Sequence, residues 1–315
     1  MAQDARVKVT IALPTYRRPE KLRGLLPMLT AQADEVRTRP GSPFDVELLV
    51  VDNDSERSGE DAAREAADPH LRYVVEPTPG ISAARNRAMD ESVRSNVLVF
   101  MDDDELPRDG WLEHLLQVWQ ETRPAAVSGR VVVTYEGTLD PWIAAGGFFR
   151  RRTMPTGTEI RVASTNSILL DLDQVRRIGV RFAADLGLTG GSDTLFSRQL
   201  VRGGGRIVWC DESVVDDLLP AIRMTRRWVL KRARRHGNTA SIVEIRMAAG
   251  GWGTRLVRAR ECTRGAVRIV GGGARFLFGA ILRSRTHEAR GLRVVYRGAG
   301  MIAGATGVIY QEYAR

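Results

Sequence analysis

The chain has little of what small disulfide-bonded or zinc-stabilised folds need. Only 2 cysteines occur among its 315 residues, Cys210 and Cys262, with no zinc-type spacing, so neither a disulfide framework nor a zinc site is expected. The first residues, MAQDARVKVTIALPTY, lack the apolar core of a signal peptide, so we expect no secretory leader. Hydrophobic residues make up 43% and charged residues 27%, which is ordinary for a globular protein of one large domain or two modest ones.

Acidic residues are scarce in the last part of the chain. Residues 221–315 contain 20 Lys and Arg against 4 Asp and Glu, whereas residues 1–220 contain 27 against 34. A mildly acidic body with a strongly basic end predicts an anionic partner for the end, either nucleic acid or anionic lipid. Aromatic side chains that would stack on bases are few in this region, which favours lipid over nucleic acid.

Apolar strands alternate with amphipathic helices over the first 130 residues. We expect, in chain order, strand 7–14, helix 19–33, strand 45–54, helix 59–68, strand 71–77, helix 83–93 with Ser82 as its N-cap, and strand 96–101. Later strands are expected at 125–136, 164–173 and 206–212, a loop entering a helix at 190–204, and a mobile loop at 137–162. This pattern predicts an α/β fold with a Rossmann-like, mostly parallel sheet flanked by helices.

Polar clusters follow three of these strands: PTYRR (14–18), DNDS (52–55) and DDDE (102–105). Ligands of such sheets bind beyond the carboxyl ends of the strands, so the clusters predict a site. If the segment stays extended, Asp102 and Asp104 face the same way and Asp103 faces elsewhere. Such a DXD pair fits Mg²⁺ or Mn²⁺ shared with substrate phosphates. The alternative is a solvated acidic turn.

Five further residues are candidates for binding or catalysis. Asp52 can accept hydrogen bonds from a nucleoside, and Thr15 and Tyr16 can supply a hydroxyl and an aromatic face. Arg85 lies near enough to the edge to reach a diphosphate, although it equally fits a surface charge. Asp193, in GGSDTLF, can act as a general base for an incoming hydroxyl. The alternatives are turn chemistry for Asp52 and a helix N-terminal carboxylate for Asp193.

The ordered set LPTYRRPEKL, VVDNDS, PGISAARNRAM, FMDDDELP and GGSDTLFSRQL resembles family 2 glycosyltransferases of the GT-A fold, most nearly bacterial exopolysaccharide-type members. The resemblance covers about residues 7 to 237. It implies inverting transfer of a sugar from a nucleoside diphosphate, with UDP expected, to an acceptor hydroxyl. We therefore expect a GT-A catalytic domain over residues 1–220, and the shift in composition predicts a basic amphipathic helical region over residues 221–315.

Carried over residue by residue, the resemblance implies a complete site. Asp193 would be the catalytic base and Asp104 the principal metal ligand, joined by Asp102 and, less directly, by Asp216 or Asp217. The residues implied around the nucleotide are Pro14, Thr15, Tyr16, Arg17, Asp52, Arg85, Asp102 and Asp103. The sequence departs from the family pattern at Ser192, where relatives often carry Glu, and this puts a second carboxylate role in doubt.

The basic end has an amphipathic pattern. Within residues 264–285 apolar side chains recur at three- and four-residue spacing beside Arg264, Arg268 and Arg275, which suits a helix lying in a membrane interface. Three glycines, 271–273, are expected to weaken that helix. The uncharged run 298–310 is too short to span a bilayer. Packing against the catalytic domain or an oligomer partner is the alternative.

These observations predict a metal-dependent glycosyltransferase on the cytoplasmic face of the membrane, acting on a glycan or lipid-linked acceptor. A sugar-phosphate nucleotidyltransferase is the nearest enzyme rival, but the early Gly-rich, basic phosphate loop of that class is missing. A non-catalytic nucleotide- or nucleic-acid-binding module that uses the basic end is the rival from another class.

Overall fold

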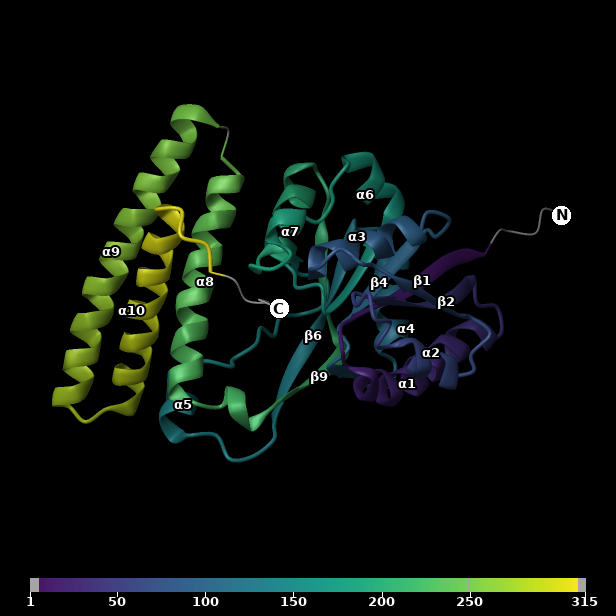
Figure 1. Cartoon of the computed structure of the whole chain (residues 1–315), viewed down its shortest axis with the longest axis horizontal. Coiled ribbons are helices and arrows are strands. Elements are labelled where there is room, and N and C mark those ends of the chain that lie inside the picture. The colour runs from purple at the N-terminus through teal and green to yellow at the C-terminus, as the bar shows by residue number, and fades with distance from the viewer. Residues whose placement is uncertain (1–5, 249, 311–315) are drawn as a thin grey trace. The chain divides into compact units, whose positions relative to one another are not determined.

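The computed structural model describes residues 6–248 and 250–310, which divide into two compact units. Unit 1 comprises the described residues up to Val132, together with Arg152–Leu188 and Ser192–Asp217. Unit 2 comprises Val133–Arg151, Thr189–Gly191 and the described residues from Leu218 onward. Figure 1 shows the elements of both units along the chain.

Unit 1 is built on a nine-stranded sheet in the described part of the chain, with the order β3-β2-β1-β4-β8-β6-β9-β5 and β7 beside β9. The strands are β1 Val7–Thr15, β2 Phe44–Asp52, β3 Leu71–Val75, β4 Val97–Met101, β5 Glu105–Pro107, β6 Ala126–Tyr135, β7 Glu159–Ile160, β8 Ser167–Asp171 and β9 Ile207–Leu219. The last residues of β6 and β9 belong to unit 2.

The first four strands pair in parallel, as predicted. β1 lies between β2 and β4, and β3 lies outside β2. The strands after Met101 pair antiparallel, β8 with β4 and β6, and β9 with β5 and β7. The α/β class is confirmed, and the sheet is mixed, because its second half reverses direction.

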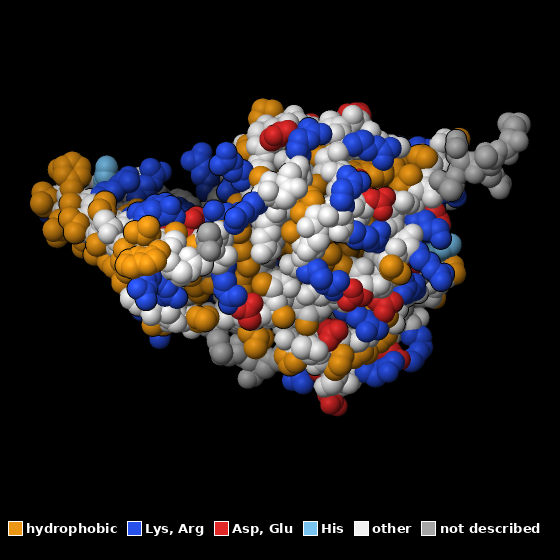
Figure 2. Space-filling model, turned by 90° about the horizontal axis from the view of Figure 1, so that it is seen from above, with side chains coloured by type: hydrophobic (Ala, Val, Ile, Leu, Met, Phe, Trp, Pro, Cys, Tyr) orange, Lys and Arg blue, Asp and Glu red, His pale blue; other side chains and the backbone are white. Residues whose placement is uncertain are grey.

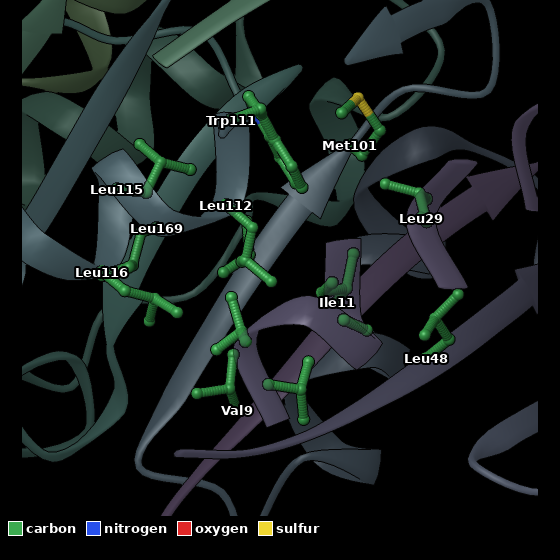
Figure 3. Close-up of a cluster of buried hydrophobic side chains, with 14 of the residues drawn as sticks. Val9, Ile11, Leu29, Leu48, Met101, Trp111, Leu112, Leu115, Leu116 and Leu169 are labelled. Atoms are coloured by element: carbon green, nitrogen blue, oxygen red, sulfur yellow. The ribbon is translucent and has the colours of Figure 1, made fainter. Parts of the chain in front are cut away.

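Helices cover both faces of the sheet because successive strand residues point to opposite sides. On one face, Val9, Ile11 and Leu48 pack in a core with α1 (Pro19–Thr38), the short α2 (Glu60–Glu65) and α4 (Trp111–Thr122). Figure 3 shows α4 contributing Trp111, Leu112, Leu115 and Leu116 to this core, beside Leu29 of α1, Met101 of β4 and Leu169 of β8.

On the other face, Leu49, Leu98 and Phe100 pack with α3 (Ile81–Glu91), α6 (Leu172–Ile178) and α7 (Ser192–Arg202). The predicted capping role of Ser82 was wrong. The N-cap of α3 is Gly80, which has φ 119° and donates its N–H to Asn53 Oδ1 at 2.8 Å. Ser82 therefore lies inside the first turn of α3, where it is buried.

Unit 2 is helical. It contains α5 (Pro141–Gly146), α8 (Arg226–Arg246), α9 (Gly251–Ile281) and α10 (Arg285–Ala305), with a 3₁₀ turn at Ala221–Arg223. Unit 1 has a 3₁₀ turn at Ala184–Leu186. The segment expected as a loop at 137–162 thus contains a helix and, in unit 1, strand β7. Figure 1 shows α10 lying between α8 and α9.

Glycines set how closely these helices approach. α9 runs unbroken through Gly271, Gly272 and Gly273. A Cβ on Gly272 would lie 2.9 Å from Gly291 O of α10, whereas a Cβ on Gly271 or Gly273 would meet nothing within 4 Å. The glycines were expected to weaken the helix, but the middle one is needed where α9 and α10 touch. None of the described helices combines the length and apolarity that crossing a bilayer requires.

Candidate active site

Three polar loops of unit 1 lie at one edge of the sheet, where β1, β2 and β4 end. β1 and β2 end in register, with Thr15 opposite Asp52, and β4 lies beside β1. Helix α3 brings Arg85 to the same edge, where its Nη2 atom lies 3.7 Å from Asp102 Oδ1. The charge of Asp193, at the start of α7, helps to raise the pKa of Asp102, so α7 also begins near this edge.

Arg18 is the positive partner of the acidic run after β4. Its Nη1 atom donates to Asp103 Oδ1 at 2.7 Å and to Asp104 Oδ2 at 3.1 Å. Thr15 Oγ1 donates to Asp103 Oδ2 at 2.7 Å. Asp103 is only 5% exposed, and this burial raises its carboxyl pKa although the charge of Arg18 acts in the opposite direction. Asp103 therefore ties the ends of β1 and β4 together.

The acidic run does not continue β4 as an extended segment. β4 ends at Met101, and the following residues turn so that the N–H of Glu105 donates to Asp102 O at 3.3 Å. The extended geometry assumed in the prediction is therefore absent, although Asp103 does face away from Asp102 and Asp104 as predicted. The turn sends Asp103 inward, while the side chains of Asp102 and Asp104 stay 35% and 31% exposed. The two predicted metal ligands are thus the accessible carboxylates of the run.

Asp102 lies among like charges. The pKa of its carboxyl is raised to about 6, chiefly because burial disfavours the charged form. The negative charges of Asp104, Asp103 and Asp193 raise this pKa further, and the positive charge of Arg85 lowers it. A cation at this point would relieve the repulsion between the carboxylates. Within residues 6–248 and 250–310, no three His, Cys, Asp or Glu side chains are arranged to hold a metal by themselves. The donor set therefore fits a hard divalent cation only if substrate oxygens complete its ligand shell.

Asp52 lies beneath the loop that follows β2. Its side chain is fully buried and accepts hydrogen bonds from Gly59 N at 2.7 Å, Tyr73 Oη at 2.7 Å and Asp54 N at 3.1 Å. Burial and the bond to Asp52 raise the pKa of the Tyr73 hydroxyl, which stays protonated and donates. In this conformation Asp52 shapes the loop from below.

The loop after β1 differs from residue to residue. Pro14 is buried within β1, opposite Val51 of β2. Tyr16 is partly exposed, and the guanidinium of Arg17 lies over its ring at 5.2 Å. Arg17 has φ 52°, and its Nε donates to Asp54 Oδ2 at 3.0 Å, which links the first and second loops. Tyr16 and Arg17 are therefore the accessible members of the predicted nucleotide set in this loop.

Asp193 lies in the first turn of α7. Its Oδ1 atom accepts the N–H of Thr194 at 2.7 Å, and the side chain remains partly exposed. Gly190 and Gly191 precede it with φ of 81° and 94°, a backbone that other residues rarely adopt. Asp193 thus combines partial exposure with a position near Asp102, as a base acting at this edge requires.

Eight buried side-chain polar atoms have no hydrogen-bond partner in the described structure, and four of them belong to residues near this edge. These four are Ser82 Oγ and Arg85 Nε of α3, Thr165 Oγ1 just before β8, and Ser192 Oγ at the start of α7. Buried polar groups are normally bonded, so such a group of atoms marks a place for a polar ligand.

The model of the family described as glycosyl transferase family 2 matches residues 10–176. The chain belongs to this family. The succinoglycan biosynthesis protein ExoM of Rhizobium meliloti (strain 1021) is 34% identical to this glycosyltransferase over 268 residues, which cover 82% of this chain and 84% of ExoM.

Solved glycosyltransferases share the fold. Mannosyltransferase PcManGT from Pyrobaculum calidifontis, in complex with GDP-Man and Mn²⁺, has a TM-score of 0.57 at 17% identity, covering 93% of this chain and 86% of that one. S. aureus TarS 1–349, in complex with UDP-GlcNAc, has a TM-score of 0.53 at 12% identity and covers 92% of each chain. The GT-A fold predicted from the sequence is thereby confirmed.

The late acidic residues of this glycosyltransferase have different surroundings. Asp216 is held by Arg108, whose Nε and Nη2 atoms each donate to its carboxylate at 2.7 Å. Asp217 lies opposite Glu105 where β9 pairs with β5. The bidentate ion pair with Arg108 engages both carboxylate oxygens of Asp216.

Sequence reasoning missed two residues of this glycosyltransferase that shape the site. Arg18 stands beside the predicted Arg17, and only the turn after β4 shows that it is the one facing the acidic run. Asn53 is 4% exposed, and its amide donates to Glu76 O at 2.8 Å and Thr78 O at 2.7 Å. Its place directly after Asp52 in DNDS was the available signal, because Asn commonly fixes turns through its side chain.

Proposed function

We propose that this glycosyltransferase transfers a sugar from a nucleoside diphosphate-sugar, with UDP as the nucleotide, to an acceptor hydroxyl with inversion. In this proposal residues 1–220 carry catalysis, and residues 221–315 attach the enzyme to a membrane. The observation that carries it is the approach of the Arg85 guanidinium to within 3.7 Å of Asp102 at the edge of the sheet, where the negative charges of Asp104 and Asp193 also act on Asp102.

The donor diphosphate would lie against Asp102, Asp104 and Arg85. Asp102 and Asp104 would hold a Mg²⁺ or Mn²⁺ ion, which would supply Lewis-acid stabilisation of the leaving diphosphate. Arg85 is 8% exposed, so its charge is little screened by water and stabilises negative charge developing beside it. Asp217 remains a candidate for a further ligand.

The nucleoside would lie over the loop after β1. Tyr16 offers a partly exposed ring, and Arg17 offers a guanidinium already positioned over that ring. In this proposal the buried residues of the set do not contact the nucleoside but support the loops that line it. These residues are Pro14, Thr15, Asp52 and Asp103. The bond from Arg17 to Asp54 joins the two loops that would line the nucleoside.

Asp193 performs the proton transfer. It accepts the proton of the acceptor hydroxyl while that oxygen attacks the anomeric carbon from the face opposite the diphosphate. The new bond joins the acceptor oxygen to the anomeric carbon, the bond to the diphosphate oxygen breaks, and the nucleoside diphosphate leaves with the bonding electrons. One displacement inverts the configuration, so no covalently attacking carboxylate is needed.

The acceptor is a glycan or a lipid-linked glycan, and the product belongs to polysaccharide biosynthesis. The name of ExoM, which refers to succinoglycan biosynthesis, supports this role. A lipid-linked acceptor fits an enzyme on the cytoplasmic face of the membrane, and the basic end of the chain supports that location.

The test compares Asp193→Asn with Asp173→Asn. Asp193→Asn removes the base, so transfer or donor hydrolysis should fall by about 10²- to 10⁴-fold while nucleotide binding stays intact. Asp173→Asn alters an exposed ion pair with Arg176 on α6, so it should leave the rate within about twofold. Full activity in Asp193→Asn with normal donor binding would show that Asp193 is not the base.

A further inference from the structure

The outward side of α9 carries a row of exposed apolar side chains. We call the apolar stripe the residues Trp252, Leu256, Val267, Val270, Leu277 and Ile281, which are between 61% and 79% exposed. At 100° per residue these six positions fall within about 80° of one another around the helix. A monomeric protein rarely exposes a contiguous apolar patch of more than a few hundred Å². A stripe along most of a 31-residue helix therefore needs an occupant.

The opposite side of α9 is committed to α10. Gly265, Gly272 and Gly279 recur every seven residues and lie so near α10 that an added Cβ would come within 3.0 Å of its atoms. Glycines of α10 lie equally close to α9: a Cβ on Gly291 would lie 2.6 Å from Phe276 N, and a Cβ on Gly298 would lie 2.6 Å from Gly265 O. Because this side is closed by backbone contact, α9 cannot turn its stripe inward without breaking its packing on α10.

The charges beside the stripe indicate what covers it. Arg264, Arg268 and Arg275 lie along one flank, and at the start of the helix the Arg255 guanidinium lies over the Trp252 ring at 5.3 Å. Glu261 is the single acidic residue between 251 and 281. It is buried, and it is paired with Arg264 at 2.7 Å, so the outer side of α9 presents arginines without carboxylates.

A second copy of the chain is a poor occupant for this surface. Stripe-to-stripe contact would bring Arg268 and Arg275 of both copies together, and Glu261, the one acidic residue of α9, is already buried and paired with Arg264. An anionic lipid surface instead offers hydrocarbon for the stripe and negative headgroups for the arginines. Figure 2 shows hydrophobic side chains gathered at the left end of the view, where α9 lies, with Lys and Arg side chains beside them.

We infer that α9 lies in the plane of an anionic membrane, with the apolar stripe among the acyl chains and Arg264, Arg268 and Arg275 at the headgroups. The inference rests on the proposed membrane attachment and assigns it to one face of one helix. A helix of this length covers about 45 Å of membrane surface, so the attachment would be along the helix.

Vesicle sedimentation with the full-length chain tests the inference. The probes are vesicles of phosphatidylcholine alone and vesicles containing 40% phosphatidylglycerol. The wild type should bind the anionic vesicles at least tenfold more tightly than the neutral ones. Val270→Glu/Leu277→Glu should lose binding to the anionic vesicles by at least tenfold. Val93→Glu, which charges an apolar side chain 67% exposed in unit 1, is the matched control and should bind like the wild type.

The arginine flank has its own variant. Arg268→Gln/Arg275→Gln should lower binding to anionic vesicles by roughly 25-fold, since each arginine near such a surface contributes a factor of about five. Binding to neutral vesicles should not change. Equal loss on both kinds of vesicle would contradict the assigned role of the flank.

Three further results would overturn the inference. The first is a wild type that binds neither kind of vesicle, and the second is a stripe variant that binds vesicles as the wild type does. The third is a wild type that forms a dimer without lipid while the stripe variant, unlike the other variants, is a monomer. Circular dichroism checks that each variant is folded. Nucleotide binding measured on the same proteins separates this inference from the proposed sugar transfer: absent vesicle attachment with retained nucleotide binding refutes the inference alone, and the converse refutes the proposed sugar transfer alone.

Discussion

The three consecutive glycines of α9 allow the packing of unit 2 to be tested one residue at a time. A Cβ on Gly271 or Gly273 meets nothing within 4 Å, whereas a Cβ on Gly272 lies 2.9 Å from Gly291 O and from Val295 N of α10. All three lie in the interior of the same helix, so their helix propensities are alike. Their substitutions by alanine therefore differ mainly in the contact with α10.

The expected magnitudes follow from these distances. Gly271→Ala and Gly273→Ala should each raise the free energy of unfolding of unit 2 by up to about 1 kcal/mol, the difference in helix propensity. Gly272→Ala gains the same propensity but forces two backbones apart, and overpacking of this kind costs about 1 to 3 kcal/mol. Its unfolding free energy should thus lie about 1 to 3 kcal/mol below that of Gly271→Ala.

A position with a closer approach gives a stronger version of the same test. A Cβ on Gly300 of α10 would lie 1.8 Å from Arg234 O of α8, where real Cβ atoms stay at least 3.0 Å away. Gly300→Ala should therefore separate α10 from α8 and cost about 3 kcal/mol or more, at the upper end of what overpacking causes.

Urea unfolding monitored by hydrogen exchange in peptides of α9 and α10 measures these differences. A local probe is needed because the chain has two compact units, which need not unfold in one step. Protection should rise in Gly271→Ala and Gly273→Ala and fall in Gly272→Ala and Gly300→Ala. The reasoning fails if Gly272→Ala behaves like its two neighbours, since α9 would then not touch α10 at this point.

Three further predictions concern unit 1. Arg18→Met removes the cation beside the buried Asp103 carboxylate and should lower the free energy of unfolding in urea by about 1 to 2 kcal/mol. The loss should be smaller than for a fully buried ion pair because the Arg18 side chain is 43% exposed. An equal loss in an Asp103→Asn background would contradict this prediction. Asn53→Ala removes three hydrogen bonds of a buried amide and should lower the free energy of unfolding by about 3 kcal/mol. A loss below about 0.5 kcal/mol would show that these hydrogen bonds do not stabilise the loop. Burial raises the pKa of the Cys210 thiol to about 11, so iodoacetamide at pH 8 should label Cys262 and leave Cys210 unmodified until the protein unfolds. Raising the pH to 9 should not change that order. Prompt labelling of Cys210 in the folded protein would contradict the prediction.

The sequence predicted the fold well where local patterns decide it. Near-continuous apolar runs located β1, β2 and β4 to within two residues, because both faces of these strands are buried. The antiparallel half was harder to predict. The pairing of β8 with β4 joins Leu98 to Leu170 across a long stretch of chain, and no local pattern records such a partner.

The candidate site shows the same division between local and distant information. The clusters at the ends of β1, β2 and β4 were visible because parallel strands end at one edge. The inward turn of Asp103 was not visible, because it depends on Thr15 and Arg18, which lie more than 80 residues away. Likewise the close approach at Gly272 depends on where α10 lies, so composition alone indicated only a weaker helix.

The central claim is that the edge bearing Asp102, Asp104 and Arg85 binds a nucleoside diphosphate together with a divalent cation. Calorimetric titration of UDP into the full-length protein tests it most directly, once with Mn²⁺ and once with EDTA, with GDP as the comparison nucleotide. The account predicts that Mn²⁺ tightens UDP binding at least tenfold and that Asp104→Asn removes this gain. UDP binding that is equally tight in EDTA, or a gain that Asp104→Asn retains, would contradict it.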